Sequence, residues 1–254
     1  MNHCFAEVLF NLNVLNHRYK LIQDGCHVFY AYLHLINRRQ HMSFSINGVS
    51  IPDTQITRDT TTFIRDTESD LLFHHSSRVY YWGALAGQRL GLNVDHELLY
   101  VGCMFHDIGL THEHCSCDKR FEVDGANAAK HFLQGYGIAQ ADIDKVWTAI
   151  ALHTTPGIPE FMAPEIALVT AGVEMDVLGI NYEAFSDSER SAVVQQHPRT
   201  DRFKEDIIQA FYDGIKDKSQ RISGNFNTDV IQDKEPGLVP LNICHVIRNS
   251  RWKG

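Results

Sequence analysis

The chain has 254 residues, of which 44% are hydrophobic and 21% are charged. This composition provides enough apolar side chains for a core and excludes a mainly disordered chain. The formal net charge of -8 argues against a protein that binds nucleic acid by neutralising phosphates. No apolar run reaches the roughly 18 residues of a transmembrane helix, so we expect neither a membrane nor a nucleic-acid partner.

Two residue types stand out by number. The six cysteines show neither a CxxC pair nor the spacing of a disulfide framework, so we expect reduced thiols and a cytoplasmic location. The 15 histidines justify a search for metal-binding or acid–base chemistry.

Residues 1–41 differ from the rest, because Lys and Arg outnumber Asp and Glu there, whereas the remainder is acidic. Their apolar stretch, 26–36, lacks the basic start and the cleavage site of a secretory signal. We interpret residues 1–41 as an N-terminal extension: either an added helix or strand, or sequence upstream of a natural start at Met42. Residues 42–254 are expected to form one domain, with a core over about 70–180 and a C-terminal helical segment over 181–254.

From residue 51 onward, apolar spacing of three and four residues predicts helices. In chain order they are expected within 51–70 and over 71–90, 97–108, 121–134, 140–152 and 163–178, with two or three more in 186–218. Asp95 is a plausible N-cap for the helix 97–108, and Gly109 is expected to stop it. Strand signals are weak throughout, so we predict an all-α fold.

The pair His106-Asp107 lies at the end of the helix 97–108, which is apolar nearly all round and should be buried. A single His-Asp dipeptide of this kind, taken by itself, is usually a core histidine beside a capping aspartate. However, an ionised carboxylate at the end of a buried helix is costly unless something pairs with it. A divalent cation would remove that cost.

Three further ionisable residues, His75, His153 and Asp176, interrupt the apolar stripes of their predicted helices and should point inward. Each alone is read most simply as a satisfied core polar group. Together with His106-Asp107 they make a mixed nitrogen and oxygen donor set, which suits Zn, Fe or Mn. We read the dense cluster His112, His114, Cys115 and Cys117 as a surface loop, with a second zinc site as the alternative.

The order His75, His106-Asp107, Asp176 resembles the H…HD…D motif of the HD-domain superfamily of metal-dependent hydrolases, as do the contexts HSSRV from residue 75 and FHDIG from residue 105. The resemblance implies a helical bundle in which His75, His106, Asp107 and Asp176 hold one divalent metal ion between core helices, zinc before iron or manganese. Leu110 and Phe121 stand where cyclic-dinucleotide phosphodiesterases of this superfamily carry Lys and a second-metal His, so a single ion is expected.

Further segments resemble the branch that contains the cyanamide hydratases; they are RFEVDGANAA, AIALHTTPGIPE and TAGVEMDVLG. This resemblance implies a hydratase or hydrolase of a small C–N compound, in which a metal-bound hydroxide attacks an electrophilic carbon. Asp107 would also orient the water, and Glu122 or His153 would deliver a proton. Arg78 is expected to pair with a helix terminus or a ligand carboxylate.

Two other functions stay open. A phosphohydrolase of a nucleotide or phosphomonoester is the first, although the motif segments hold few Lys and Arg. A non-catalytic ligand-binding HD scaffold is the second. The expected partner is a small-molecule substrate, and the sequence leaves a homo-oligomer open.

Overall fold

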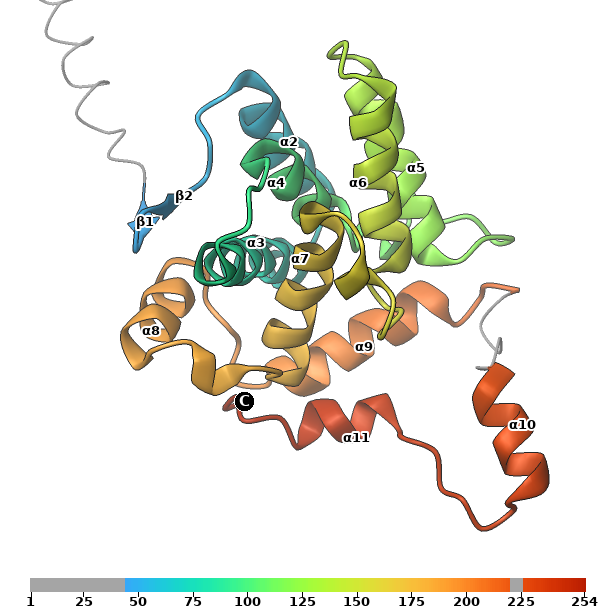
Figure 1. The fold of residues 1–254 in the computed structure, drawn as a ribbon. Coiled ribbons are helices and arrows are strands. Elements are labelled where there is room, and N and C mark those ends of the chain that lie inside the picture. Colours follow the sequence, from blue (N-terminus) through green and yellow to red (C-terminus); the bar gives the residue numbers. More distant parts are fainter. Residues whose placement is uncertain (1–43, 220–225) are drawn as a thin grey trace, which may run out of the picture. The chain divides into compact units, whose positions relative to one another are not determined.

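A computed structural model describes residues 44–219 and 226–254, and this part of the chain is mostly helical, as predicted (Figure 1). Residues Ser45–Gly254 make up one unit, whereas the predicted extension 1–41 lies outside the described residues. The sheet found in the described part is a single antiparallel pair, β1 (Ser45–Ile46) and β2 (Val49–Ser50). Among the helices of the same part, none has the length and apolar character needed to cross a membrane.

The described helices follow the predicted order. They are α2 (Gln55–Thr67), α3 (Asp70–Leu90), α4 (His96–Phe105), α5 (Phe121–Gln134), α6 (Gln140–Leu152), α7 (Pro164–Val173), α8 (Asp187–Gln196), α9 (Phe203–Ile215), α10 (Phe226–Lys234) and α11 (Ile243–Arg248). Short helical turns lie between them: η1 (Ile108–Leu110), η2 (Pro159–Phe161), the π-helical turn η3 (Glu174–Leu178) and η4 (Tyr182–Ala184).

Local signals explain where α3 and α4 begin. The side chain of Ser69 accepts a hydrogen bond from the N–H of Leu72 at the start of α3. Asp95 accepts from the N–H groups of Glu97 and Leu98, which confirms its predicted role as the N-cap of α4. Gly91, with φ of 64°, ends α3 in the left-handed conformation that glycine adopts without strain.

One predicted boundary differs. The helix expected over 97–108 ends at Phe105, and His106 and Asp107 lie in a turn before η1. The ring nitrogen Nδ1 of His106 lies 2.7 Å from the carbonyl oxygen of Cys103, so the side chain of His106 donates to a carbonyl of the last helical turn. His106 keeps helical backbone angles as the C-cap of α4, whereas Asp107 departs from them, with φ of -105° and ψ of 0°.

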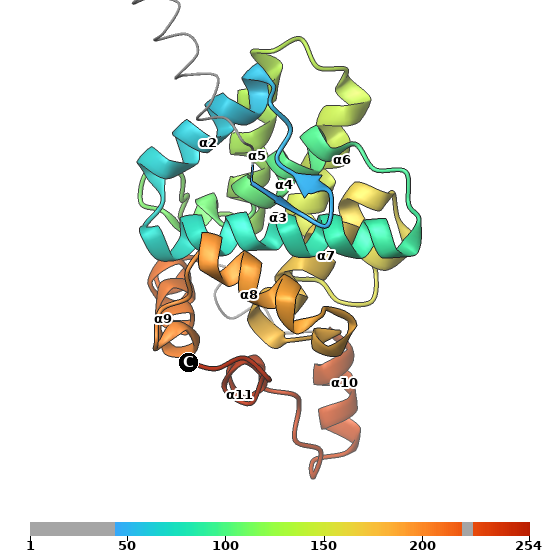
Figure 2. The same cartoon turned by 90° about the vertical axis from the view of Figure 1, so that its left-hand side faces the viewer.

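Helix α3 lies at the centre of the unit, with α2 on one side and α8 and α9 on the other in the view of Figure 2. It packs unusually closely against α7. A Cβ atom on Gly172 would lie 2.3 Å from the carbonyl oxygen of Val79, and one on Gly83 would lie 2.6 Å from that of Leu168. Glycine is therefore required at both positions. The close approach of α3 and α7 also brings Asp176, in η3, beside His75 and Arg78 of α3.

The C-terminal helices attach to this bundle through a second apolar cluster. Its buried members are Leu72, Leu110, Val177, Phe203, Ile207 and Ile247. They come from α3, η1, η3, α9 and α11, so α9 and α11 cover the side of the bundle on which His75 lies. The ring of Phe203 stands 6.1 Å from that of His75, measured between centroids.

Candidate metal centre

Three of the predicted site residues meet in the core. His75 comes from α3, and His106 and Asp107 come from the turn after α4; all three are buried. Nε2 of His75 lies 3.2 Å from Nε2 of His106. Oδ2 of Asp107 lies 3.2 Å from Nε2 of His106 and 3.6 Å from Nε2 of His75. These ligand atoms lie within 4.8 Å of one another, so the three residues could hold a metal ion.

His153 reaches the same place from the end of α6. Its Nε2 lies 3.6 Å from Oδ1 of Asp107. Its ring is perpendicular to that of His106, with 4.9 Å between the centroids. His153 falls just outside the group of three whose ligand atoms are mutually within 4.8 Å. The prediction that His153 points inward is confirmed by its burial.

The three imidazoles share one hydrogen-bond arrangement. Each Nδ1 lies 2.7 Å from an acceptor: Oδ2 of Asp176 for His75, the Cys103 carbonyl for His106 and the Ile150 carbonyl for His153. A neutral ring that donates through Nδ1 keeps a lone pair on Nε2. In that state, three such lone pairs would face the carboxylate of Asp107, which is the arrangement that metal-binding histidines adopt.

The carboxylate of Asp107 lacks any hydrogen-bond donor. Both of its oxygens are buried and neither accepts a hydrogen bond. A buried, ionised carboxylate facing nitrogen lone pairs is strongly unfavourable unless a cation lies between them. The residues present therefore fit a divalent metal ion.

Asp176 is placed differently from the prediction that it is the fourth ligand. Its oxygens accept from Nε and Nη2 of Arg78 at 2.8 and 2.9 Å, from Nε1 of Trp82 at 2.9 Å and from Nη1 of Arg199 at 3.1 Å. It contacts His75 at Nδ1, the nitrogen that faces away from Asp107. The structure thus leaves Asp176 outside the group of three ligands. The expected pairing of Arg78 with a carboxylate is confirmed.

Glu122 stands near His153, at the start of α5, and is almost fully buried. Its Oε2 lies 3.2 Å from Nε of Arg120, and the hydroxyl of Thr154, the residue after His153, donates to its Oε1. Burial raises the pKa of Glu122, but the hydrogen bonds from Arg120 and Thr154 bring it below the ordinary value. Glu122 is therefore ionised at neutral pH, which suits a proton acceptor better than a resting acid.

Asp124 has a structural role, in line with the expectation that it belongs to the first turn of a helix. Nζ of Lys218 lies 2.7 Å from Oδ2 of Asp124, and the N–H and hydroxyl of Ser116 also bond to this carboxylate. The ion pair ties α5 to the segment just after α9, and Ser116 joins the loop before α5 to the same carboxylate.

The histidine- and cysteine-rich loop shows no metal geometry. Within the described residues, the group that could hold an ion contains none of His112, His114, Cys115 or Cys117. Cys115 and Cys117 are free and exposed. His114 packs its ring 5.6 Å from that of Phe63. The structure favours the surface-loop interpretation.

Sequence reasoning missed three buried or partly buried residues that interact with Asp176 or Asp107. Trp82 lies on the apolar stripe of α3, and this position did not indicate that its indole N–H donates to Asp176. Arg199 follows α8 in an irregular stretch, where no periodicity indicates direction. Glu68, at the end of α2, is buried, and both burial and the charge of Asp107 raise its pKa.

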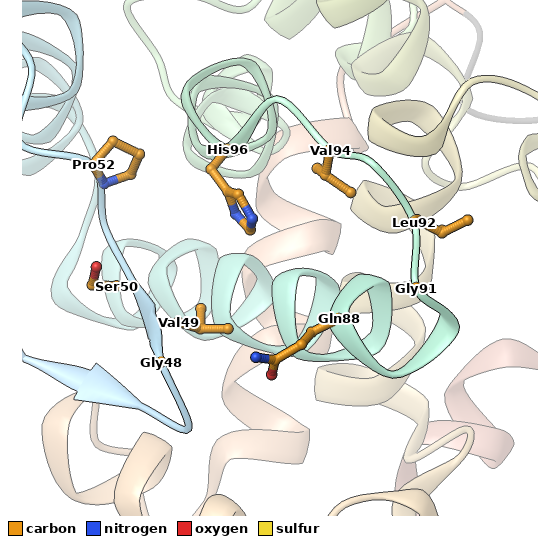
Figure 3. A pocket seen from close by; sticks show the side chains of 9 residues that line it. All are labelled: Gly48, Val49, Ser50, Pro52, Gln88, Gly91, Leu92, Val94 and His96. Atoms are coloured by element: carbon orange, nitrogen blue, oxygen red, sulfur yellow. The ribbon is translucent and has the colours of Figure 1, made fainter.

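The hollow in Figure 3 lies away from this centre, between β2 and the connection from α3 to α4. Its volume is about 530 Å³, and none of the predicted site residues lines it. His75, His106 and Asp107 have at most 1% of their surface exposed, and His153 has 3%. These four side chains are therefore almost completely closed off from solvent.

Residues 72–197 match the family model of the HD domain. The matched range contains His75, His106, Asp107, His153 and Asp176, together with the helices that carry them. No curated protein matches the chain significantly. With an all-helical bundle and a buried His-His-Asp group that could hold a metal ion, this part of the chain is an HD domain.

Proposed function

We propose that this protein is a metal-dependent hydratase or hydrolase that adds water to a small C–N compound such as cyanamide. The observation that carries the proposal is Asp107: a buried carboxylate without a hydrogen-bond donor, faced by the Nε2 atoms of three imidazoles. His75, His106 and Asp107 would hold the ion. Nitrogen and oxygen donors of this kind suit zinc first, with iron or manganese as alternatives.

A divalent ion in this centre supplies Lewis acidity, which lowers the pKa of a water molecule from about 15.7 toward 7. Hydration of cyanamide to urea places the water oxygen on carbon and both of its protons on nitrogen, so no oxidant or reductant is needed. The chain must accept one proton from water and return it to the substrate nitrogen.

Glu122 is the best proton carrier near the centre. It is ionised, buried and held by Arg120 and Thr154 beside His153. Asp107, with two oxygens that accept no hydrogen bond, can both bind the ion and orient water. The order of events would be proton uptake by Glu122 and then its delivery to the substrate nitrogen.

The surroundings of the centre favour a small uncharged substrate over a phosphate ester. Arg78 and Arg199 are paired with Asp176, and Arg120 is paired with Glu122, although Nε and Nη2 of Arg199 have no hydrogen-bond partner. A phosphate group would need free cationic donors. The near-complete burial of His75, His106 and Asp107 also disfavours a substrate as large as a nucleotide.

The test is urea release from cyanamide by purified protein loaded with zinc, iron or manganese, beside a panel of phosphomonoesters assayed for phosphate. We expect urea from the wild type and none from Asp107→Asn. Phosphate release without urea would replace the proposal with a phosphohydrolase. A filled metal site without turnover of either class would favour the ligand-binding scaffold.

A further inference from the structure

The geometry points to a second binding site, for a small oxyanion, at the guanidinium of Arg199. The ligand class is a carboxylate or a phosphate that presents two oxygens to one edge of this guanidinium. Arg199 lines a hollow of about 590 Å³ between α8 and the residues after α11, and no residue of the metal centre lines it. The site is therefore separate from the metal centre, and it does not depend on the proposed function.

Arg199 is a buried arginine with only part of its donors in use. Its side chain is 5% exposed. Nη1 donates to the backbone carbonyl of Asp176 at 2.9 Å and to Oδ1 of the same residue at 3.1 Å. Nε and Nη2 are buried as well, and neither has a hydrogen-bond partner among the described residues. A buried cationic donor without an acceptor is costly, so this edge of the guanidinium needs one.

The unpaired edge is the one with which other arginines of this chain bind a carboxylate. Arg78 donates from Nε and Nη2 to the two oxygens of Asp176, at 2.8 and 2.9 Å. Arg248 donates from the same two nitrogens to the two oxygens of Glu205, at 2.7 and 2.9 Å. Nε and Nη2 form a fork that matches the two oxygens of a carboxylate or a phosphate. The fork of Arg199 therefore favours an oxyanion over chloride or a neutral ligand.

The buried charges around Arg199 leave one positive charge unbalanced. Arg78 and Arg199 are both buried, and Asp176 is the acidic partner that they share. In the part of the chain that the structure describes, neither arginine forms an ion pair with a second carboxylate. One carboxylate thus faces two guanidinium groups. Burial of an unpaired charge is unfavourable, and a bound anion would supply the missing partner.

The guanidinium of Arg199 is held in place before any anion binds. The ring centroids of Phe203 and Trp252 lie 3.8 and 4.6 Å from its Cζ. The carbonyl of Pro198, the preceding residue, accepts from Nη1 of Arg78 at 2.7 Å. A side chain that is already fixed loses little conformational freedom on binding, which favours affinity.

The walls of the hollow carry more positive than negative side chains, although the chain as a whole is acidic. Beside Arg199, the cationic ones are Arg190, Arg251 and Lys253, and the acidic ones are Asp187 and Asp201. Arg190 pairs with Asp187, which reduces the repulsion of an anion by that carboxylate. Lys253 is exposed. The local excess of positive charge attracts an oxyanion to the hollow.

The test measures the affinity of the zinc-loaded full chain for inorganic phosphate and for acetate, by calorimetry at constant ionic strength set with chloride. Arg199→Lys keeps a positive charge beside Asp176 and removes the fork. We expect this variant to bind the preferred anion about tenfold more weakly or worse, since one hydrogen bond to a charged group is worth at least that factor. The anion that the wild type binds more tightly identifies the ligand class.

The matched control is Arg248→Lys, because the fork of Arg248 is already occupied by Glu205. This variant should bind the anion as the wild type does. Equal affinities of Arg199→Lys and the wild type would overturn the inference. Saturable binding of neither anion by the wild type would overturn it too.

Asp107→Asn separates this site from the metal centre. An anion bound at Arg199 should keep its wild-type affinity in Asp107→Asn, whereas loss of binding would place the anion on the metal ion and contradict the inference. If the wild type holds no metal and still binds the anion through Arg199, the proposed function fails and this inference stands.

A measurement on the wild type covers the case in which Arg199→Lys does not fold. NMR of the arginine Nε–H groups should show a shift of the Arg199 signal when the preferred anion is added, and no shift for Arg248. An Arg199 signal that does not respond would contradict the inference.

Discussion

The Nδ1 atom of His75 lies 2.7 Å from Oδ2 of Asp176, and the opposite nitrogen of the same ring faces Asp107 at 3.6 Å. The imidazole thus connects two buried carboxylates with different surroundings. Asp176 is saturated by Arg78, Trp82 and Arg199, whereas Asp107 has no donor. Asp107 is therefore the carboxylate that needs a cation, whereas Asp176 already has its partners.

Asp107→Asn should abolish stabilisation by metal. A ligand that binds only the folded state, at 100 times its Kd, raises the free energy of unfolding by about 2.7 kcal/mol. The wild type should show this gain with zinc in thermal or denaturant unfolding, and Asp107→Asn should show none. An equal gain in the variant would mean that zinc binds elsewhere.

Gly172→Ala should disturb the contact between α3 and α7. The added Cβ would lie 2.3 Å from the carbonyl oxygen of Val79, which is backbone and cannot turn aside. We expect a loss of about 1–3 kcal/mol or more in the free energy of unfolding, together with weaker zinc binding because η3 and Asp176 shift. Gly237→Ala is the control, since no atom lies within 4 Å of its added Cβ. Equal stability of the two variants would contradict the described packing.

Lys218→Met should be strongly destabilising, because it removes the cation from the buried carboxylate of Asp124. Loss of one partner of a buried ion pair costs about 3–5 kcal/mol. The double variant Lys218→Met with Asp124→Asn should recover part of that loss, which urea unfolding measures. If the double variant is no more stable than Lys218→Met, the ion pair between α5 and the segment after α9 does not stabilise the fold as described.

His197 should make the fold sensitive to acid. Burial, followed by the positive fields of His74 and Arg78, lowers the pKa of His197 from 6.5 to about 3. Between these values the unfolded chain binds the proton and the folded chain does not, so stability falls as the pH falls from about 6.5 toward 3. The slope from this residue is at most about 1.4 kcal/mol per pH unit.

The check compares wild type with His197→Gln, both stripped of metal so that metal release does not contribute. Urea unfolding at pH 7 and at pH 4.5 should show a smaller loss of stability in the variant. Identical losses in the two proteins would mean that His197 is protonated in the folded state.

Much of the fold could be predicted, because the apolar stripes of α3 to α7 repeat every three or four residues. The same stripes indicated that His75, His153 and Asp176 point inward, and the apolar helix before His106 indicated that His106 is buried. The end of α4 was missed, because the apolar run continues to Ile108 although the chain turns at His106. The partners of Asp176 could not be predicted from the sequence either. Arg199 lies in an irregular stretch without periodicity. Only the tertiary packing shows that Arg78, Trp82 and Arg199 converge on one carboxylate.

The central claim is that Asp107 and the imidazoles around it hold a divalent ion. Elemental analysis of the purified wild type beside Asp107→Asn tests it most directly. The account predicts about one zinc, iron or manganese ion per wild-type chain and a large loss in the variant. A wild type without metal, even after reconstitution with each of the three ions, would contradict it.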